Sequence, residues 1–573
     1  MNAQNQRSCF IRLASGVRIS IPLFLMWMIG GGLIRGQDQA GSASKPAAGN
    51  AAPVAAERSL VCVDPLVKVF RDATDLPTTE PETHVAAGEF ATLQFVFRSP
   101  AAIADLHAAV AGDVPGAVVR YVGYVKVGRS YGGAPADVLK SADRTFPDPL
   151  LEDKTVAVAA NQNQPIWITI PAKTPGEWHG KLTLRWAGGE IGRPFTVHVL
   201  NVKMNKPRLG VTNWWCSDAE RLAMLAGHKV DPFSDEYWKL IRQFADFMVQ
   251  YHQNMIMVSP LDLAQIGFND DKWTFDFSRF DKMVQTFVDA GVVGRIEGGH
   301  IGGRSSEVWS SPFVVRVPEF AGGTVHFENK PPTDPVARRF YGQYLPALAA
   351  HLADRGWDKI YRQHLADEPI NDNAASYRVM ADMLHEFAPG VRVMEATQTR
   401  ELVGAVNTWV PILDHFHRDY DFFREREKAG DEVWFYTCCG PTGEYANRFI
   451  ELPLIKTRLL HWINFRYGAA GYLHWGFNYW NPATSPFDET TFQWPGGDSW
   501  IAYPKDGKLL SSIRLEAMRD GIGDNELLSM LAERDAAAAQ KVAAEMILDF
   551  NRYNTDVVHF RALRRQLLDA LAK

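Results

Sequence analysis

Apolar and polar residues alternate with a period of two along residues 59–204. The alternating apolar positions include Leu93, Phe95 and Phe97, then Ile166, Ile168 and Ile170, and later Phe195, Val197 and Val199. Turn-forming pairs such as Pro115-Gly116 and Gly188-Gly189 separate these runs. Successive side chains of a strand point to opposite faces, and no segment here has a long helical period. The pattern predicts an all-β first part, a β-sandwich domain over residues 59–206.

After residue 206 the apolar period becomes that of helices separated by short strands. In the predicted helix 234–250, an N-cap serine and two acidic residues precede an apolar face. That face consists of Tyr237, Ile241, Phe244 and Met248. Eight strands are predicted at 211–215, 255–258, 294–297, 359–366, 392–396, 412–416, 433–438 and 471–475. Further helices are predicted at 280–290, 336–355, 374–387, 422–428 and 453–467.

This alternation favours a (β/α)8 TIM-like barrel, which we predict over residues 207–504. The rival is an open doubly wound sheet, but no glycine-rich dinucleotide loop follows any predicted strand. Residues 505–573 are predicted to form a C-terminal helical extension packed on the barrel. The predicted fold class is therefore multidomain, all-β followed by α/β.

The N-terminus has the pattern of a secretory signal peptide, predicted over residues 1–36. Arg7, Arg12 and Arg18 form a basic region, and residues 19–34 form an apolar region broken by proline and glycine. That region is short for a membrane span, so cleavage is favoured over N-terminal anchoring. Residues 37–58 are rich in Ala, Gly, Ser and Pro and predict a flexible linker. We therefore expect a secreted or periplasmic protein without stable membrane insertion after cleavage.

Composition narrows the function classes. A hydrophobic content of 46% and a charged content of 22% are typical of a globular protein, and the net charge of −6 gives no basic footprint for nucleic acid. Four cysteines remain after signal cleavage, too few for a disulfide framework in a chain of this length. Cys438-Cys439 could form a strained vicinal bridge or stay as two buried thiols. No zinc spacing occurs, so neither metal nor cofactor is expected.

The candidate chemistry centres on Asp367-Glu368, which follows the predicted strand 359–366 and precedes Pro369. Carboxylates are costly near a core, and the carboxyl ends of barrel strands carry active sites. The alternative is a helix N-cap, since acidic residues also favour a first helical turn. Pro369-Ile370 separates the pair from the predicted helix, so we take Asp367 and Glu368 as the candidate catalytic residues.

Other strand ends would bring polar and aromatic side chains into the same cleft. The candidate substrate-binding residues are Trp215, His300, His364, Gln398, Tyr436, Trp475, Asn478 and Trp480. Flat aromatic faces pack on sugar rings, while amide and hydroxyl groups bond sugar hydroxyls. His415 and His417 could suggest a metal pair, but no matching pair follows the first predicted strand, so a metal site is disfavoured. The expected partner is a glycan; the oligomeric state stays open.

Glycoside hydrolysis ordinarily uses two carboxyl groups that flank the scissile bond. The seventh predicted strand ends in Tyr436 and supplies no carboxylate before Glu444. A contiguous Asp-Glu pair without an opposing nucleophile fits substrate-assisted catalysis, in which the sugar's own 2-acetamido oxygen attacks C1. Alternatively, Glu297 or Glu395 serves as the second carboxylate on a sugar without the acetamide. A catalytically silent glycan-binding protein is the third possibility.

Several segments resemble those of the glycoside hydrolase family 123-like, β-N-acetylgalactosaminidase-related proteins. They are Phe275-Asp276-Phe277-Ser278-Arg279-Phe280-Asp281, Asp367-Glu368-Pro369, Trp434-Phe435-Tyr436-Thr437-Cys438-Cys439, His474-Trp475-Gly476-Phe477-Asn478-Tyr479-Trp480 and Arg514-Leu515-Glu516-Ala517-Met518-Arg519-Asp520-Gly521. The resemblance covers residues 59–531 and implies a sandwich and a barrel. It also implies an exo-acting hydrolase of β-linked N-acetylhexosamine, with Asp367 orienting the acetamide and Glu368 as general acid/base. Arg514, Glu516 and Asp520 are expected to form a structural ion-pair network.

Overall fold

A computed structural model describes residues 57–573 except 129–134, 293, 322–323 and 491–493. Arg58–Lys573 form one compact unit. The predicted signal peptide and nearly all of the predicted linker lie outside the described residues, so both stay predictions. Among the helices of the described part, none combines the length and the apolar composition needed to cross a bilayer.

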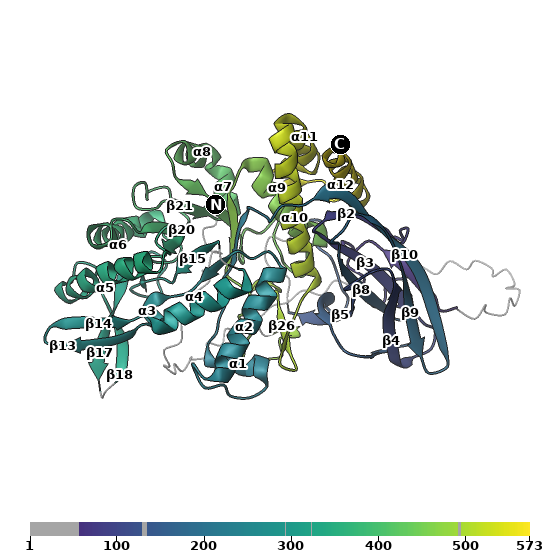
Figure 1. Ribbon diagram of the computed structural model, residues 1–573, viewed down its shortest axis with the longest axis horizontal. Helices are drawn as coiled ribbons and strands as arrows, with labels where there is room; N and C mark the ends of the chain where they lie inside the picture. Colours follow the sequence, from purple (N-terminus) through teal and green to yellow (C-terminus); the bar gives the residue numbers. More distant parts are fainter. Residues whose placement is uncertain (1–56, 129–134, 293, 322–323, 491–493) are drawn as a thin grey trace, which may run out of the picture. The chain divides into compact units, whose positions relative to one another are not determined.

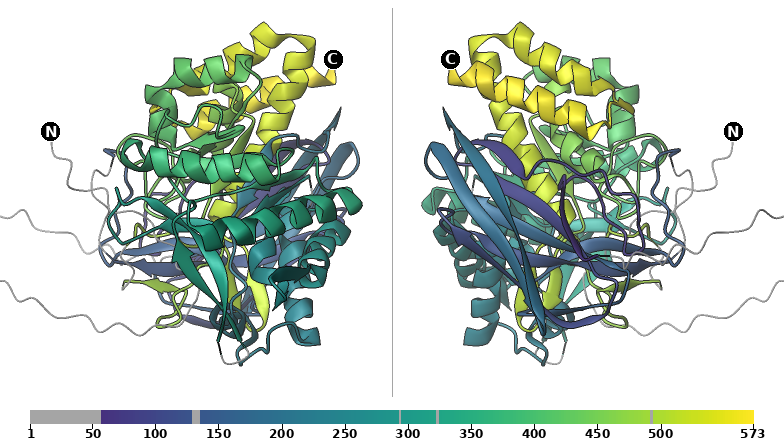
Figure 2. Two further views of the ribbon diagram at one scale, coloured as in Figure 1. Left: turned by 90° about the vertical axis from the view of Figure 1, so that its left-hand side faces the viewer. Right: turned by 90° about the vertical axis from the view of Figure 1, so that its right-hand side faces the viewer.

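Two sheets form the strand-rich first part of this unit. Its strands are β1 (Ser59–Val63), β2 (Glu82–Ala87), β3 (Phe90–Arg98), β4 (Ile103–Gly112), β5 (Val118–Val127), β6 (Thr145–Leu151), β7 (Val156–Val158), β8 (Asn163–Pro171), β9 (Gly176–Trp186) and β10 (Gly189–Lys203). One sheet has the order β1-β3-β8-β5, with β6 and the later strand β25 (Asp488–Glu489) also paired to β5, and the other has the order β2-β10-β9-β4-β7. The long strands of both sheets lie side by side in the right-hand view of Figure 2.

The period-two pattern explains the packing of these sheets. Phe95 and Ile168 in the first sheet and Leu182 and Val197 in the second all belong to one buried hydrophobic cluster. All four lie at alternating positions of their strands, and their side chains are fully buried. The apolar faces of the two sheets therefore share a single core.

Strands and helices alternate from Gly210 onward. The strands are β11 (Gly210–Asn213), β12 (Met255–Met257), β13 (Gln265–Asn269), β14 (Lys272–Asp276), β15 (Arg295–Gly298), β16 (Gly302–Arg304), β17 (Phe313–Ala321), β18 (Thr324–Lys330), β19 (Tyr361–Gln363), β20 (Arg392–Thr397), β21 (Thr408–Pro411), β22 (Glu432–Val433), β23 (Phe435–Tyr436), β24 (Gly471–His474), β25 (Asp488–Glu489), β26 (Tyr503–Lys505), β27 (Lys508–Leu510), β28 (Ile547–Asp549) and β29 (Arg552–Tyr553). The helices are α1 (Ala219–Ala226), α2 (Asp235–Gln250), α3 (Pro260–Leu263), α4 (Ser278–Ala290), α5 (Pro335–Asp354), α6 (Ala374–Phe387), α7 (Leu413–Arg418), α8 (Tyr420–Lys428), α9 (Leu454–Tyr467), α10 (Ile513–Arg534), α11 (Ala536–Met546) and α12 (Val557–Ala572), with a 3-10 turn η1 (Asn371–Asn373).

Two parallel sheets lie inside the helices of this second part. One has the order β12-β15-β19-β20-β21-β22 and the other the order β11-β24-β23. Helices α4, α5 and α6 run outside the six-stranded sheet (Figure 1). The predicted fold class is confirmed as mixed α/β, but a closed barrel is not shown. The edges of the two sheets approach each other on both sides. On one side Ile412 and Tyr436 form an isolated β-bridge, and on the other Asn254 N donates a 3.3 Å hydrogen bond to Val211 O.

Local signals at the predicted helix 234–250 explain its agreement with α2. The side chain of Ser234 accepts a hydrogen bond from Tyr237 N, which satisfies a free donor of the first turn. Ile241, Phe244 and Met248 are completely buried. The helix is thus held by its cap and by its apolar face, both of which are local features of the sequence.

The predicted sixth strand at 412–416 is wrong. The strand is β21, Thr408–Pro411, and residues 413–418 form α7. Proline ends the ladder because it has no N–H, and acidic Asp414 followed by basic Arg418 suits the two ends of a helix. His415 and His417 therefore lie on a helix rather than on a strand. The hairpin β13–β14 and the three-stranded sheet β16-β17-β18 were also not predicted.

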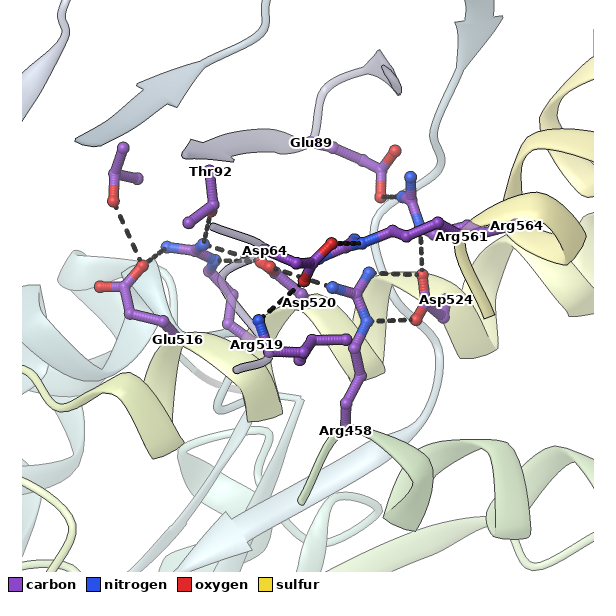
Figure 3. Close-up of polar contacts among 12 residues, drawn as sticks. Asp64, Glu89, Thr92, Arg458, Glu516, Arg519, Asp520, Asp524, Arg561 and Arg564 are labelled. Atoms are coloured by element: carbon purple, nitrogen blue, oxygen red, sulfur yellow. Dashed lines mark hydrogen bonds and ion pairs between the residues drawn. The ribbon is translucent and has the colours of Figure 1, made fainter. Parts of the chain in front are cut away.

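Helix α10 joins the sandwich to the second part through buried ion pairs (Figure 3). Glu516 on this helix contacts Arg120 of β5 at 2.9 Å and Arg519 at 2.6 Å. About two turns further on, Asp524 contacts Arg458 of α9 and Arg564 of α12, both at 2.7 Å. Breaking one side of such a buried pair costs about 3–5 kcal/mol, because it leaves an uncompensated charge.

The expected ion-pair network in the segment 514–520 is confirmed by these contacts and two more. Arg514 pairs with Asp148 of β6 at 2.7 Å, and Asp520 pairs with Arg519 at 2.7 Å. These side chains cross-link separate elements of the fold.

Candidate active site

Asp367 and Glu368 lie in the loop between β19 and η1. The strand ends at Gln363, and the N-caps of η1 and α6 are Ile370 and Asn373, so neither carboxylate caps a helix. Glu368 has a positive φ of 47°, a left-handed conformation that is uncommon for residues other than glycine. The chain thus turns sharply at the candidate catalytic pair.

Glu368 is 6% exposed and is held by a tyrosine. The hydroxyl of Tyr436, from β23, donates a short hydrogen bond to Glu368 Oε1, and Gln398 Nε2 donates to the Tyr436 hydroxyl at 3.3 Å. Burial raises the pKa of Glu368 to about 7, against the opposing hydrogen bond from Tyr436. A carboxyl group with a pKa near neutrality can donate and recover a proton at ordinary pH.

Asp367 is partly exposed beside Glu368. Burial and the charge of Glu368 raise the pKa of Asp367 to about 7, while the charges of His300 and Arg304 act in the opposite direction. Two adjacent carboxyl groups with similar pKa values titrate as a pair. Their apparent pKa values therefore belong to the pair and not to either residue alone. The pKa values of both groups therefore put the titration of the pair near neutral pH.

His364 is completely buried between two carboxylates. Its Nε2 lies 3.0 Å from Glu297 Oε2, and its Nδ1 lies 2.9 Å from Glu395 Oε1. Burial alone would lower the pKa of His364, but the charges and hydrogen bonds of these two carboxylates raise it to about 10. Despite burial, the charge of His364 lowers the pKa of Glu395 to about 2. This histidine is an imidazolium ion between two carboxylates.

The same contacts bear on two predictions for His364. Atoms of His300, His364 and Glu395 lie close enough together to hold a metal ion. A doubly protonated imidazole has no free lone pair, so His364 does not fit that role while it bridges the two carboxylates. Both ring nitrogens of His364 are engaged and its side chain is 0% exposed, which favours a structural role, and substrate contact by His364 stays a prediction.

Glu395 connects this buried cluster to the candidate pair. Its Oε2 accepts hydrogen bonds from the backbone N–H groups of Leu365 and Ala366 at 2.9 and 3.2 Å. The hydroxyl of Tyr377 donates to the same oxygen at 2.9 Å. The carboxylate therefore holds the chain immediately before Asp367.

Three of the predicted substrate-binding residues, Tyr436, Gln398 and His300, lie near the pair, and Trp475 packs beside Tyr479. Tyr436 and Gln398 approach Glu368, and His300 Nε2 lies 3.3 Å from Glu395 Oε1 with its side chain 15% exposed. Trp475 is 8% exposed, and its ring lies 5.2 Å from that of Tyr479. Burial and nearby charges, including that of Asp367, raise the pKa of Tyr479 well above its usual value.

The other three, Trp215, Asn478 and Trp480, have their polar groups bound inside the protein. Trp215 Nε1 donates to Met257 O at 3.1 Å, and Trp480 Nε1 donates to Ala502 O at 2.8 Å. Asn478 bonds both the N–H and the C=O of Cys216. Trp480 and Asn478 are 0% exposed. These contacts favour structural roles, and sugar contact by the three residues stays a prediction.

Three further residues contact the site outside the predicted substrate-binding set, and two of them, Arg304 and Asp498, were missed as site candidates. Trp214 Nε1 donates to Glu297 Oε2 at 2.8 Å. Arg304 donates to the carbonyl oxygens of Asp367 and Glu368. Asp498 accepts a 3.2 Å hydrogen bond from Trp475 Nε1. No sequence signal marks Asp498 or Arg304, because each reaches the site from a loop or hairpin outside the predicted strands.

Cysteines follow Tyr436 where a nucleophilic carboxylate could have been. The sulfur atoms of Cys438 and Cys439 lie 3.9 Å apart, well beyond the length of a disulfide bond. The alternative of two unbridged thiols is therefore the one found here. Glu444, the first carboxylate after β23, is exposed, and its Oε1 accepts a hydrogen bond from Ala136 N at 3.3 Å.

Comparison with known proteins gives a family match over more than half of the chain. The model described as "Glycoside hydrolase 123, catalytic domain" matches residues 218–531. A search of the curated proteins found no match.

Solved structures include one that is similar along nearly the whole length. It is a family 123 glycoside hydrolase from Clostridium perfringens, studied for glycolipid glycan hydrolysis, with a TM-score of 0.69 and 15% sequence identity. The match covers 90% of this chain and 97% of that chain, and at this identity it shows a common fold. A β-glucuronidase from Parabacteroides merdae (10% identity, 77% of this chain and 50% of that chain) and a GH10 xylanase from Thermobacillus composti (10% identity, 50% and 98%) have TM-scores of only 0.28.

Proposed function

Since the chain belongs to glycoside hydrolase family 123, we propose that it releases terminal β-linked N-acetylgalactosamine from glycans by substrate-assisted, retaining catalysis. The observation that carries this proposal is the contrast in burial and pKa between the four candidate carboxylates. Asp367 and Glu368 are adjacent and near neutral in pKa, whereas the other two candidates, Glu297 and Glu395, are 0% exposed and both bound to His364.

The burial of Glu297 and Glu395 argues against an enzyme nucleophile. A nucleophilic carboxylate must reach C1 of the sugar, about 5 Å from the acid in retaining enzymes. Glu395 is ionised, but its two oxygens accept hydrogen bonds from His364, Tyr377 and two backbone N–H groups. Its low pKa also makes it a weak nucleophile. An acetamido oxygen supplied by the substrate removes the need for a third reactive carboxylate.

In the first proposed step, the acetamido carbonyl oxygen forms a bond to C1 while the bond from C1 to the leaving oxygen breaks. Glu368 gives its proton to the leaving oxygen, and Asp367 accepts a hydrogen bond from the acetamide N–H and balances the positive charge of the cyclic oxazolinium ion. In the second step, water attacks C1, its proton returns to Glu368, and the acetamide is restored. The proposed starting state has Glu368 protonated and Asp367 ionised, and the pKa values of about 7 for both groups make this state accessible near neutral pH.

Trp475 is proposed as the floor of the sugar subsite. The support is its place after β24 and its contact with Tyr479, whose pKa is raised in part by the charge of Asp367. Asp498 fixes the indole through its Nε1. A sugar ring has apolar C–H faces that pack on an indole.

We also propose that the two parallel sheets close into the predicted (β/α)8 barrel. The support is the bridge of Ile412 with Tyr436 on one side and the contact of Asn254 with Val211 on the other. The sandwich over 59–206, the barrel over 207–504 and the helical extension over 505–573 remain the proposed domains. Export by a signal peptide over residues 1–36 remains part of the same proposal.

A panel of aryl glycosides tests the function. We expect purified protein to release the aryl group from 2-acetamido-2-deoxy-β-galactoside and not from the β-galactoside with a 2-hydroxyl. A thiazoline that mimics the oxazolinium ion should inhibit competitively and bind more tightly than the sugar. Asp367→Asn should abolish turnover while sugar binding persists, and Glu444→Gln, which alters an exposed carboxylate, should leave activity unchanged.

Two outcomes would reject this mechanism. One is brisk hydrolysis of the 2-hydroxyl substrate. The other is a carboxylate peptide labelled by a 2-fluoro glycosyl inactivator and detected by mass spectrometry. Sugar binding without turnover on every substrate would instead indicate a catalytically silent glycan-binding protein.

A further inference from the structure

We propose that Arg304 is a positioning residue that holds the Asp367–Glu368 peptide in its reactive conformation. The inference rests on the proposed function, because it assigns to Arg304 the task of keeping that function's two carboxylates in place. Arg304 is the last residue of β16, a strand of the sheet β16-β17-β18.

The guanidinium of Arg304 donates hydrogen bonds to the main chain of both candidate catalytic residues. Nη1 donates to Asp367 O at 3.0 Å, and Nη2 donates to Glu368 O at 2.7 Å. The remaining nitrogen, Nε, donates to Trp309 O at 2.8 Å. The same group stacks on the Trp309 ring with its central carbon 3.3 Å from the ring centroid. All three nitrogens are thus engaged, and the plane of the fork is fixed by the indole.

The backbone at Glu368 needs such an anchor. Its φ of 47° is a conformation that side chains other than glycine populate sparsely, and it persists only where the surroundings determine it. The carbonyls of Asp367 and Glu368 belong to the two peptide units on either side of the Glu368 Cα atom. Fixing both carbonyls therefore fixes the direction of the Glu368 side chain. A rotation of this segment would move Glu368 away from Tyr436 and Asp367 away from the sugar.

Other contacts hold the ends of the segment but not these carbonyls. Glu395 binds the N–H groups of Leu365 and Ala366 on the N-terminal side. Gln398 N donates to Pro369 O at 3.0 Å on the C-terminal side. Arg304 therefore fixes the backbone at the centre of the turn, while the other contacts fix its two ends.

The charge of Arg304 adds a second, measurable effect. Among the causes that set the pKa values of Asp367 and Glu368, burial is the largest and raises both, while the charge of Arg304 lowers both. Removing the charge should move the pKa values of both carboxyls upward. The acidic and basic limbs of the pH profile then move in the same direction, to higher pH.

The test compares Arg304→Lys, Arg304→Ala and a matched control. Arg378→Ala is the control, because Arg378 Nη1 likewise donates to two backbone carbonyls, those of Glu401 and Val403. For the Arg304 variants we expect kcat to fall about 100-fold on both activated and poor aryl leaving groups, the scale of a misplacement near 1 Å, with KM changed less than 5-fold. Lysine keeps the charge but not the fork, so Arg304→Lys should lose kcat without moving the pH profile.

Two further measurements separate positioning from a general loss of structure. Guanidinium ion added to Arg304→Ala should restore part of kcat, since it can refill the space against Trp309, and should do nothing for Arg378→Ala. Hydrogen exchange of the peptide carrying residues 365–370 should become faster in the Arg304 variants, with exchange elsewhere unchanged.

Each outcome decides between the two claims. If wild-type protein cleaves the acetamido substrate but the Arg304 variants keep kcat within 3-fold, the positioning role is wrong. An equal loss in the Arg378 control would also overturn it. If wild-type protein cleaves no substrate, the proposed function fails, and hydrogen exchange alone decides whether Arg304 holds the peptide: unchanged exchange refutes it.

Discussion

Replacing Tyr436 by phenylalanine removes the hydroxyl that donates to Glu368 and leaves the ring in place. Hydrogen bonds to a charged group contribute about 1.5–3 kcal/mol. One pH unit of pKa corresponds to about 1.4 kcal/mol. The hydroxyl favours the ionised form of Glu368, so its loss should raise the pKa of Glu368 from about 7 by about 1–2 pH units.

The sign of the pH effect follows from the role of Glu368. A general acid must be protonated, so activity is lost as pH rises through its pKa. A higher pKa in Tyr436→Phe should therefore shift the basic limb of the kcat/KM profile upward by about 1–2 pH units. Because the two carboxyls titrate as a pair, the limb reports an apparent value of the pair. The assay is kcat/KM between pH 4 and 10 on the aryl acetamido galactoside.

A neighbouring tyrosine provides the control for this measurement. Tyr472 on β24 is also buried, and its hydroxyl contacts Thr437 Oγ1 at 2.7 Å rather than a carboxylate. Tyr472→Phe should leave the profile in place. A basic limb that stays fixed or moves downward in Tyr436→Phe would refute the assignment of Glu368 as the acid held by this hydroxyl.

Three other outcomes are expected. Glu368→Gln should lose about 10²–10⁴ in turnover on poor leaving groups and much less on activated aryl glycosides, since only a poor leaving group needs the proton; equal losses on both would contradict the general acid. Trp475→Ala should weaken substrate binding by about 1–3 kcal/mol, seen as a rise in KM, whereas Trp480→Ala should lower thermal stability instead because that indole is completely buried. His364→Ala should destabilise the fold by about 3–5 kcal/mol in chemical denaturation, because two buried carboxylates lose their counter-charge; a change below 1 kcal/mol would show that the imidazolium contributes little.

The buried histidine also gives a pH dependence of stability. The pKa of His364 is raised in the folded protein to about 10, above its value in the unfolded chain. Its contribution is fully present below the unfolded pKa, near 6.5, and is lost as pH rises toward 10.

Local pattern by itself determined much of this protein. Alternation at Leu93, Phe95 and Phe97 marks a strand because these side chains share one face that enters the core of the sandwich, and the cap at Ser234 marks a helix start because it satisfies a local donor. The pair Asp367-Glu368 could be recognised because two carboxylates after an apolar run are costly unless they serve a site. The family resemblance rested on short contiguous segments of the same kind.

Only the tertiary structure decided which groups meet. His364 was expected to contact the sugar, but partners 67 and 31 residues away in sequence take both of its nitrogens. Arg304 reaches the backbone of Asp367 and Glu368 from a strand 63–64 residues earlier, and nothing in its own neighbourhood indicates this. Hydrophobic periodicity reports which face of an element is buried, whereas the pKa values, the backbone strain and the accessibility of a site depend on long-range contacts that periodicity does not encode.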